Sequence, residues 1–369
     1  MKIEFDTEKL LKEICKIYPY CYSRGENKLV MKRIVKKYKG KNTEFAFPLK
    51  IKIDPSVVGL IVGEGYIDER QFVFSNSNEN VIRLILDFIF QFDIQPKVTL
   101  EVATKNITRD FIIKAKNSWE EIIRSEIEKI RKRKEFNNTT EMGTLHLRYH
   151  NSCFAKVLQV ITNEVAKKAE VNRIIATEYI KGVIAAEGNV NVKKRTRCLY
   201  MIRISAKRKS LRTHYKKCLR IAGIEIYCKD MPTIYKNDPR ALNWKTGRGG
   251  AVLINRWINF YKILSINLLD IHEDKKRKFI KHFMSNKTTK WLLEFKGIDK
   301  KWFSMNDMRN IFKLKSRPRD RVIKMLDLNF IESKIVKPKD KHPRSLYCLT
   351  NNYFKFIDKL SYNAPSANG

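Results

Sequence analysis

Two stretches of the chain share one pattern: Val57–Gly65 reads VVGLIVGEG, and Ile180–Gly188 reads IKGVIAAEG. Each stretch is apolar over most of its length and ends in Glu-Gly. An apolar run that is closed by glycine is typical of a buried helix, because glycine readily adopts the conformations in which helices end. We therefore predict two buried helices, each of which presents a glutamate at its C-terminal end.

Small residues occupy matched positions in the two stretches. Gly59 and Gly63 are four residues apart, as are Gly182 and Ala186. Residues four apart lie on the same face of a helix, so each helix would have a face of small residues on which a second backbone can approach closely. The pattern predicts that the two helices pack directly against each other.

This packing would bring Glu64 and Glu187 together, although 187 − 64 = 123 positions separate them in the sequence. Two carboxylates in one site repel each other. A divalent cation removes that repulsion, and Mg²⁺ prefers oxygen ligands such as carboxylates. The two acids are therefore candidates for a shared metal site.

Both stretches resemble the LAGLIDADG motif (dodecapeptide or DOD type) of homing endonucleases, in the free-standing form in which one chain carries two motifs. The resemblance covers residues 54–270. It implies that Glu64 and Glu187 are the catalytic metal ligands, helped by the backbone carbonyls of Gly63 and Ala186, with Mg²⁺ or Mn²⁺ as cofactor. The function it implies is intron homing, in which a site-specific endonuclease hydrolyses a phosphodiester in each strand of double-stranded DNA.

The stretches depart from the family motif at a few positions. Lys181 stands where the family usually has alanine. Val62 and Ala185 stand where the family has a middle aspartate, and glutamate replaces the final aspartate in both copies. The family tolerates that last change, so both copies keep the acid that the chemistry needs.

The resemblance also implies basic residues around the metal and along the DNA. Arg148 and Arg256 each stand between an expected strand and an expected helix, and they are the candidates for orienting the attacking water. Strands put every second side chain on one face, so each four-stranded sheet would read the major groove, and two sheets would span a long, non-palindromic site. The DNA-contacting candidates in the second half are Lys193, Lys194, Arg195, Arg197, Arg203, Lys207, Arg208, Lys209, Lys245 and Arg248.

Hydrophobic periodicity predicts the same order of elements after each motif: helix, two strands, helix, two strands, helix. We therefore predict an α+β protein with two pseudo-symmetric modules, residues 51–170 and residues 171–285, each built on an antiparallel, saddle-shaped sheet. The first module is expected to have helices at 54–65, 78–92, 108–134 and 153–168, and strands at 71–75, 98–102 and 144–149. The second is expected to have helices at 171–188, 211–222 and 255–264, and strands at 199–205, 225–227 and 251–254.

Residues 1–50 and the C-terminal region differ from the modules. The first 50 residues begin with an amphipathic stretch and then turn basic, which predicts an N-terminal arm that touches phosphates. Residues 286–355 have three short helical patterns (288–295, 304–312 and 316–328) and then two strand-like runs (331–336 and 346–350) that flank a basic loop. This layout is typical of a winged helix-turn-helix, and residues 356–369 are expected to be a tail.

The winged helix-turn-helix region is strongly basic. Residues 287–369 have 19 basic and 8 acidic side chains, which gives a net charge of about 19 − 8 = +11. Its nucleic-acid-binding candidates are Arg317, Arg319, Arg321 and Lys324 in the third helical pattern and Lys339 and Lys341 in the basic loop.

The charge of the whole chain indicates a polyanionic partner. Its 369 residues carry 76 Lys and Arg against 39 Asp and Glu, a net charge of +37. Nucleic acid is the usual partner of so basic a folded chain, and no apolar run is long enough to span a bilayer. The seven scattered cysteines indicate reduced thiols and hence a cytoplasmic location. We expect a monomer that binds double-stranded DNA and no membrane.

A second function stays open on the same fold. Some members of the family no longer cleave DNA and act as splicing maturases on intron RNA, and some sporulation regulators join a LAGLIDADG domain to a helix-turn-helix. The basic C-terminal region makes a non-cleaving nucleic-acid-binding protein the alternative to the endonuclease.

Overall fold

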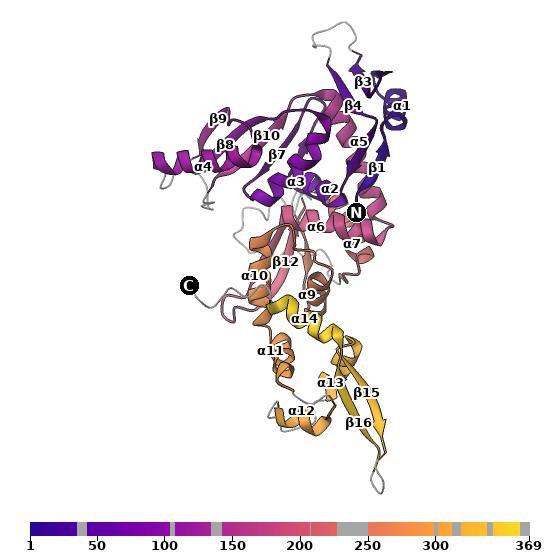
Figure 1. The fold of residues 1–369 in the computed structure, drawn as a ribbon, viewed down its shortest axis with the longest axis vertical. Coiled ribbons are helices and arrows are strands. Elements are labelled where there is room, and N and C mark those ends of the chain that lie inside the picture. Colours follow the sequence, from indigo (N-terminus) through magenta and orange to yellow (C-terminus); the bar gives the residue numbers. More distant parts are fainter. Residues whose placement is uncertain are drawn as a thin grey trace. The chain divides into compact units, whose positions relative to one another are not determined.

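The computed structural model describes residues 1–34, 43–103, 108–133, 142–206, 208–226, 250–298, 302–311, 319–337 and 342–361 (Figure 1). By contacts between residues, the chain divides into two compact units. Unit 1 comprises Met1–Asn189, Arg203–Leu253 and Ile266–His272, and unit 2 comprises Val190–Ile202, Ile254–Ser265 and Glu273–Gly369. These units divide the chain differently from the five regions that the sequence predicts.

The two motif stretches form helices in unit 1, as predicted. α2 spans Pro55–Glu64, and it begins at Asp54, whose side chain accepts a hydrogen bond from the Ser56 N–H at 2.8 Å. A proline at the first helical position costs no hydrogen bond, because that N–H would have no partner in the helix. The helix ends at Gly65, whose N–H donates to the Ile61 carbonyl at 2.8 Å.

The second motif helix, α6, spans Arg173–Glu187. Its N-cap, Asn172, accepts hydrogen bonds from the N–H groups of Ile174 and Ile175 at 3.0 and 3.1 Å. Gly188 closes it by donating to the Ile184 carbonyl. Side-chain capping and glycine ends therefore fix both helices so that a glutamate is the last helical residue of each.

A five-stranded sheet follows α2. The strands lie in the order β6-β7-β10-β8-β9, and all pairs are antiparallel except β8–β9. Phe72 and Tyr149 stack on its buried side, and both rings contact Phe154 of α5. The elements are β6 (Tyr66–Ile67), β7 (Phe72–Asn76), α3 (Glu79–Ile89), a 3₁₀ turn (Phe90–Phe92), β8 (Lys97–Ala103), α4 (Arg109–Ile123), β9 (Lys129–Arg133), β10 (Thr144–Tyr149) and α5 (Ser152–Ala169).

The long charged helix predicted at 108–134 is wrong in its second half. α4 ends at Ile123, because Arg124 adopts a left-handed conformation with φ of 51°. Residues Lys129–Arg133 then form β9, which pairs parallel to β8. Parallel neighbours need a crossover connection, and α4 supplies it. The sheet is therefore mixed and has one more strand than predicted for a module.

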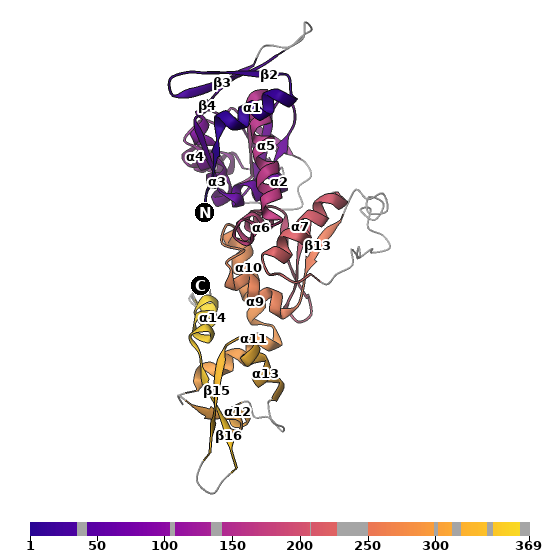
Figure 2. The same ribbon diagram turned by 90° about the vertical axis from the view of Figure 1, so that its right-hand side faces the viewer.

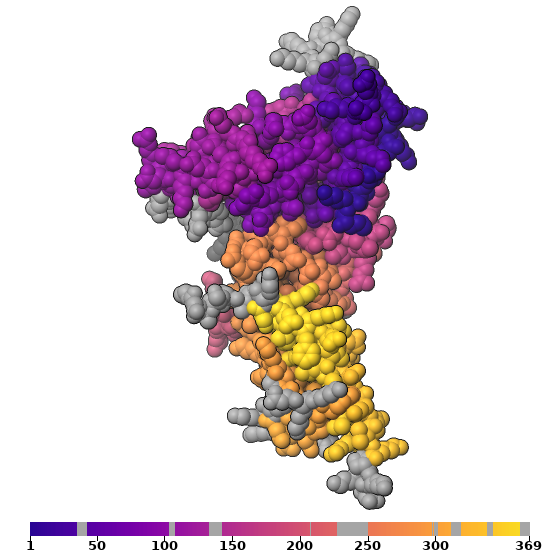
Figure 3. All heavy atoms as spheres, in the orientation of Figure 1, coloured from indigo at the N-terminus to yellow at the C-terminus, as the bar shows by residue number. Residues whose placement is uncertain are grey.

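The described parts of the first 50 residues, 1–34 and 43–50, are folded into unit 1, which corrects the predicted arm. β1 (Ile3–Asp6) pairs antiparallel with β5 (Lys50–Ile53). β2 (Tyr20–Arg24), β3 (Lys28–Arg33) and β4 (Glu44–Pro48) form an antiparallel sheet, and α1 (Thr7–Ile17) buries Leu10, Leu11 and Ile14. In the space-filling view these indigo elements and the purple sheet form one continuous body (Figure 3). Leu29 and Met31 of β3 are buried, whereas Lys28 and Lys32 are exposed on the other face of the strand.

The second motif helix is followed by a smaller sheet with the order β11-β12-β13. Helix α7 follows β12, and α9 follows β13, in the predicted order. The strand predicted at 225–227 is absent at residues 225 and 226, and residue 227 lies outside the described residues. The elements are β11 (Gly188–Val192), β12 (Leu199–Ser205), α7 (Lys209–Ile221), β13 (Ala251–Ile254) and α9 (Trp257–Ser265).

In the described C-terminal part of unit 2, one helix, α10, comes first. Three helices (α11, α12 and α13) and a β-hairpin follow, and a last helix, α14, comes after the hairpin. A sheet of order β14-β16-β15 contains the hairpin (Figure 2). Ser304 and Asp307 exchange hydrogen bonds at the start of α12 and so form a reciprocal cap. The elements are α10 (Glu273–Met284), α11 (Lys287–Glu294), a 3₁₀ turn (Phe295–Gly297), β14 (Phe303–Ser304), α12 (Met305–Ile311), α13 (Arg319–Asp327), β15 (Ile331–Val336), β16 (Arg344–Leu349) and α14 (Asn351–Ser361).

The predicted tail, 356–369, is corrected in its first part. Residues 356–361 belong to α14, in which Phe356, Ile357 and Leu360 are buried. Their spacing places them on one face of a helix, and this face packs on the aromatic cluster of unit 2.

None of the helices in the described part of the chain is both long and apolar enough to cross a membrane.

Candidate metal and nucleic-acid site

The two motif helices touch backbone to backbone. A Cβ atom added to Gly59 would lie 2.0 Å from the Tyr179 carbonyl oxygen, and one added to Gly182 would lie 1.8 Å from the Ser56 carbonyl oxygen. Real Cβ atoms do not approach other atoms this closely, so only glycine fits at these two positions. The faces of small residues predicted from the two motifs are therefore the faces by which α2 and α6 meet.

The C-terminal ends of the two helices also meet. A Cβ atom added to Gly63 would lie 2.5 Å from the Ala186 Cβ and 3.4 Å from the Glu187 Cγ. The Glu187 side chain thus passes beside the residue that precedes Glu64. Both glutamates are half-buried, and each lies at the C-terminal end of its helix, where the helix dipole places partial negative charge on the backbone carbonyls.

Asn76 supports Glu64 from the neighbouring strand. It is the last residue of β7, it is buried, and its Nδ2 donates a hydrogen bond to Glu64 Oε2. Its own Oδ1 accepts from the Asn78 N–H at 2.7 Å, which fixes the orientation of the amide. Asn76 is not among the residues predicted from the sequence, although an amide at the end of the strand that follows a motif helix is a signal for such a role.

The oxygen ligands at the ends of α2 and α6 suit Mg²⁺ better than a metal ion that takes all its ligands from the protein. Within the described ranges, no group of three or more His, Cys, Asp or Glu side chains could hold a metal ion. Mg²⁺ is commonly bound by only one or two carboxylates, with water and substrate phosphates as the remaining ligands. Two half-buried carboxylates beside helix-terminal carbonyls match that requirement.

Arg148 lies on the solvent side of the five-stranded sheet. The buried residues of β10 are Leu145, Leu147 and Tyr149, so Arg148 shares the other face with Thr144 and His146. His146 Nδ1 lies 2.7 Å from Ser75 Oγ, and its Nε2 lies 3.7 Å from Glu101 Oε2. A pocket of about 130 Å³ on this face is lined by Lys97, Thr99, Glu128, Lys129, Arg131, His146, Arg148 and His150.

This pocket contains basic residues that the sequence analysis did not select. Lys97 is on β8, next to Arg148 in the register, and Lys129 and Arg131 are on β9. With Arg148 they give four cationic side chains against one carboxylate, that of Glu128, in the lining. Lys129 and Arg131 alternate with Ile130, a pattern typical of a strand, but the sequence prediction placed these residues in a helix that ran to residue 134.

Arg256 lies between β13 and α9, as the sequence predicts. Its backbone is left-handed, with φ of 76°, and its carbonyl accepts a hydrogen bond from the Phe260 N–H. The two glutamates belong to unit 1, whereas Arg256 belongs to unit 2. A catalytic role for Arg256 therefore stays a prediction.

Four of the predicted DNA-contacting residues lie in the turn between β11 and β12. In this basic turn, residues 193–198, the side chains of Lys193, Lys194, Arg195 and Arg197 are all exposed. The turn is closed by the Lys193 N–H, which donates to the Cys198 carbonyl at 3.0 Å. It is anchored to α10, because His282 Nδ1 donates to the Arg197 carbonyl at 2.6 Å. A rigid turn of exposed cations is well suited to contact phosphates.

The remaining basic candidates are scattered. Arg203 is half-buried on β12, and Arg208 and Lys209 are exposed at the start of α7. Arg319 is exposed at the start of α13. The candidates Lys207, Lys245, Arg248, Arg317, Lys339 and Lys341 lie outside the described residues.

Two cations of α13 lie over tryptophan rings. The Arg321 guanidinium lies 5.4 Å from the centre of the Trp291 ring, and Lys324 Nζ lies 4.7 Å from the centre of the Trp257 ring. Burial lowers the pKa of Lys324. Both side chains therefore take part in cation–π contacts within unit 2, a role that the sequence analysis did not consider.

No family model matches the chain, and no curated protein matches its sequence. Among solved structures, the chain is similar to I-DmoI in complex with DNA and Mn, at 17% identity and a TM-score of 0.33, over 58% of this chain and 94% of that chain. It is similar to I-DmoI in complex with DNA and Ca at 17% identity and a TM-score of 0.32, over 57% of this chain and 86% of that chain. Similarities of this size establish no family.

Proposed function

We propose that the chain is a site-specific, metal-dependent DNA endonuclease of the LAGLIDADG homing type. The observation that carries the proposal is the direct packing of α2 on α6 through Gly59 and Gly182, with a half-buried glutamate at the C-terminal end of each helix. Two carboxylates at neighbouring helix ends repel each other, and a divalent cation bound between them would remove that repulsion.

In this proposal Glu64 and Glu187 hold Mg²⁺ or Mn²⁺, together with the carbonyls of Gly63 and Ala186. The ion, when bound, supplies the charge that makes water nucleophilic and neutralises the phosphate. Asn76 keeps the Glu64 carboxylate turned toward the ion. Arg148 is the candidate for orienting the attacking water from the sheet, and Arg256 is the candidate for the same task in the second half.

The same proposal assigns DNA contacts to three surfaces. The solvent side of the five-stranded sheet offers Lys97, Lys129 and Arg131, and the basic turn offers four exposed cations. The order helix, short strand, two helices, hairpin between residues 287 and 349 supports a winged helix-turn-helix as the third surface. A monomer with two non-identical halves would recognise a long, non-palindromic site.

The test is cleavage of a randomised double-stranded DNA library in Mg²⁺, followed by sequencing of the cut ends. The control is the Glu64→Gln, Glu187→Gln double variant, which keeps the size and shape of both side chains but removes their charges. We expect recurrent paired cuts with the wild-type chain and none with the control. Cuts that persist in the double variant would assign the activity to other residues or to a contaminant.

A non-cleaving nucleic-acid-binding protein is the second candidate. It is favoured by the C-terminal arrangement of helices and hairpin, which is separate in unit 2 from the two glutamates and could act alone on DNA or on intron RNA. This function would be supported if the wild type and the Glu64→Gln, Glu187→Gln variant both retain specific DNA or RNA fragments and neither nicks them in Mg²⁺ or Mn²⁺. The charge of +37 suits either candidate and does not discriminate between them.

A further inference from the structure

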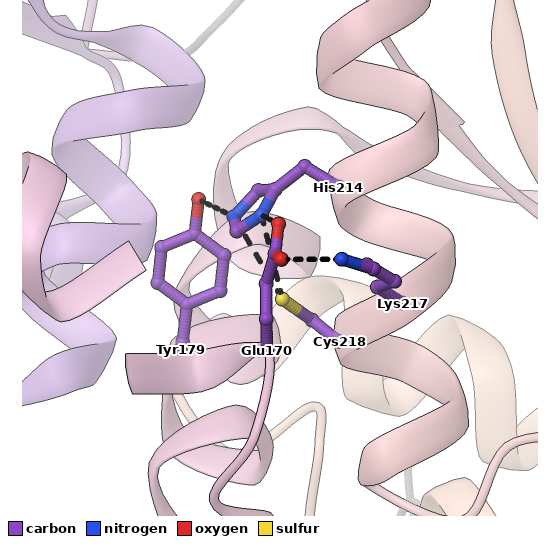
Figure 4. Close-up of polar contacts among 5 residues, drawn as sticks. All are labelled: Glu170, Tyr179, His214, Lys217 and Cys218. Atoms are coloured by element: carbon purple, nitrogen blue, oxygen red, sulfur yellow. Dashed lines mark hydrogen bonds and ion pairs between the residues drawn. The ribbon is translucent and has the colours of Figure 1, made fainter. Parts of the chain in front are cut away.

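A polar cluster joins three helices of unit 1 beside the second motif helix. His214 of α7 lies between Glu170 at the end of α5 and Tyr179 of α6 (Figure 4). Its Nδ1 is 2.8 Å from Glu170 Oε1, and its Nε2 is 3.1 Å from the Tyr179 hydroxyl. Lys217 Nζ donates to the other oxygen of Glu170 at 2.7 Å. The cluster therefore fixes how α7 sits on α6.

The chemistry of the cluster is structural. Cys218 Sγ lies 3.7 Å from His214 Nε2 and 3.8 Å from Nδ1, but both nitrogens have nearer oxygen partners. Burial raises the pKa of Cys218 to about 12, so the sulfur is a neutral thiol rather than a nucleophilic thiolate. In the described part of the chain, these residues also form no metal-binding group.

The cluster shows which face of α6 is turned toward α7. Tyr179, Val183 and Glu187 are spaced by four residues, so they follow one face of the helix. The Tyr179 hydroxyl reaches His214 of α7. Glu187 therefore lies at the C-terminal end of the face that α7 covers.

Tyr215, the residue after His214, has a hydroxyl that the fold does not use. The side chain is fully buried, and its hydroxyl has no hydrogen-bond partner among the described residues. Tyr215 lies on α7, which packs on the face of α6 that ends at Glu187. Burial, and after it the negative charge of Glu187, raises the pKa of Tyr215, in agreement with this placement. Buried polar groups are nearly always paired, so an unpaired hydroxyl beside a candidate metal ligand requires an explanation.

We propose that Tyr215 is the positioning residue of Glu187: its hydroxyl donates a hydrogen bond to the Glu187 carboxylate when that carboxylate holds a divalent cation. The Glu170–His214–Tyr179 cluster keeps α7 in the register that makes this possible. Carboxylates that bind metals are generally held by such hydrogen bonds. The two acids then have different supports, Asn76 for Glu64 and Tyr215 for Glu187. This inference depends on the proposed function.

The chain offers a matched pair of variants for the test. Tyr215→Phe removes only the hydroxyl. Tyr149→Phe removes another buried tyrosine hydroxyl that has no partner among the described residues, and burial is the sole cause that raises the pKa of Tyr149. Because neither hydroxyl is paired, both variants should melt at or above the temperature of the wild type. This result separates a positioning role from a role in stability.

Two further readouts test the position itself. Binding of Mn²⁺ alone is measured by electron paramagnetic resonance of the free ion, and cleavage is measured under saturating DNA as a function of Mg²⁺. We expect Tyr215→Phe to bind Mn²⁺ about 10-fold more weakly and to need more Mg²⁺ for half-maximal rate. We expect Tyr149→Phe to match the wild type in both readouts.

The outcomes are distinguishable. If the wild type binds Mn²⁺ and cleaves DNA but Tyr215→Phe does both equally well, the inference is wrong and the proposed function stands. If Tyr215→Phe melts at a lower temperature than the wild type as well as binding Mn²⁺ more weakly, the hydroxyl has a structural role and the inference is again wrong. If the wild type binds no Mn²⁺ and cuts no DNA, the proposed function fails and the inference fails with it.

Discussion

At the scale of single residues, the two glycines at the helix contact decide more than any charged group. Gly59 and Gly182 each face a backbone carbonyl of the partner helix at a distance that no side chain tolerates. Glycine in a helix interior costs roughly 1 kcal/mol relative to alanine. Close packing of α2 on α6 must offset that cost, and it is this packing that brings the Glu187 side chain beside Gly63, the residue before Glu64.

Gly182→Ala tests this argument, because helix propensity alone favours alanine. The added Cβ would lie 1.8 Å from the Ser56 carbonyl oxygen, so the helices must separate. We expect a loss of about 1–3 kcal/mol in the free energy of unfolding, as is typical of overpacked cores, together with loss of cleavage. Gly25→Ala is the control, since its Cβ would lie 3.3 Å from the nearest atom, the Lys28 carbonyl oxygen. A stability gain in Gly182→Ala, measured by urea unfolding, would refute the close contact.

At the scale of elements, β9 changes what the five-stranded sheet can do. It adds to β8 in parallel, and it brings Lys129 and Arg131 to the face that carries Lys97 and Arg148. A helix over the same residues, as predicted from the sequence, would have spread these charges around its axis. The strand aligns them in one pocket, where they can contact one backbone of DNA.

The combined change Lys97→Ala, Lys129→Ala, Arg131→Ala should weaken DNA binding with a characteristic salt dependence. Each phosphate contact contributes about one unit to the slope of log K against log salt. We therefore expect the slope to fall by about 3, measured by fluorescence anisotropy over a salt series. The control removes the exposed lysines Lys9, Lys12 and Lys16 of α1, and an equal fall in slope there would show that charge alone, without position, explains the effect.

At the scale of the whole molecule, the chain consists of two units whose cores are built differently. Unit 1 is centred on the motif helices and the five-stranded sheet, whereas unit 2 has a cluster of aromatic rings. In that cluster, Phe356 of α14 stacks on Phe330 with 5.2 Å between ring centres, and it also contacts Trp257. The last described helix is thus part of the core of unit 2.

Phe356→Ala should destabilise unit 2 by about 3–5 kcal/mol, the usual cost of removing a buried phenylalanine. Chemical unfolding followed by tryptophan fluorescence is a suitable measurement, because Trp257 is in contact with the ring. Phe354→Ala is the control, since Phe354 is 48% exposed, and it should cost less than about 1 kcal/mol. Equal effects of the two changes would mean that α14 does not pack as described.

Much of the fold follows from local sequence. The motif helices and strands such as Leu199–Ser205 and Ala251–Ile254 were predicted, because periodicity and terminal glycines act within a few residues. The two glutamates were found in the same way, from a repeated short pattern. These are properties that the sequence determines by itself.

Tertiary structure decided the rest. β9 is a strand because β8 offers an edge to pair with, and residues 1–33 are ordered because β1 pairs with β5 and α1 packs on the neighbouring elements. Phe356 is buried because distant rings surround it. Asn76, Tyr215 and the Glu170–His214–Tyr179 cluster likewise acquire their roles from neighbours far away in the chain. Periodicity cannot reveal such contacts, since it reports only which side of an element is apolar and not which element covers it.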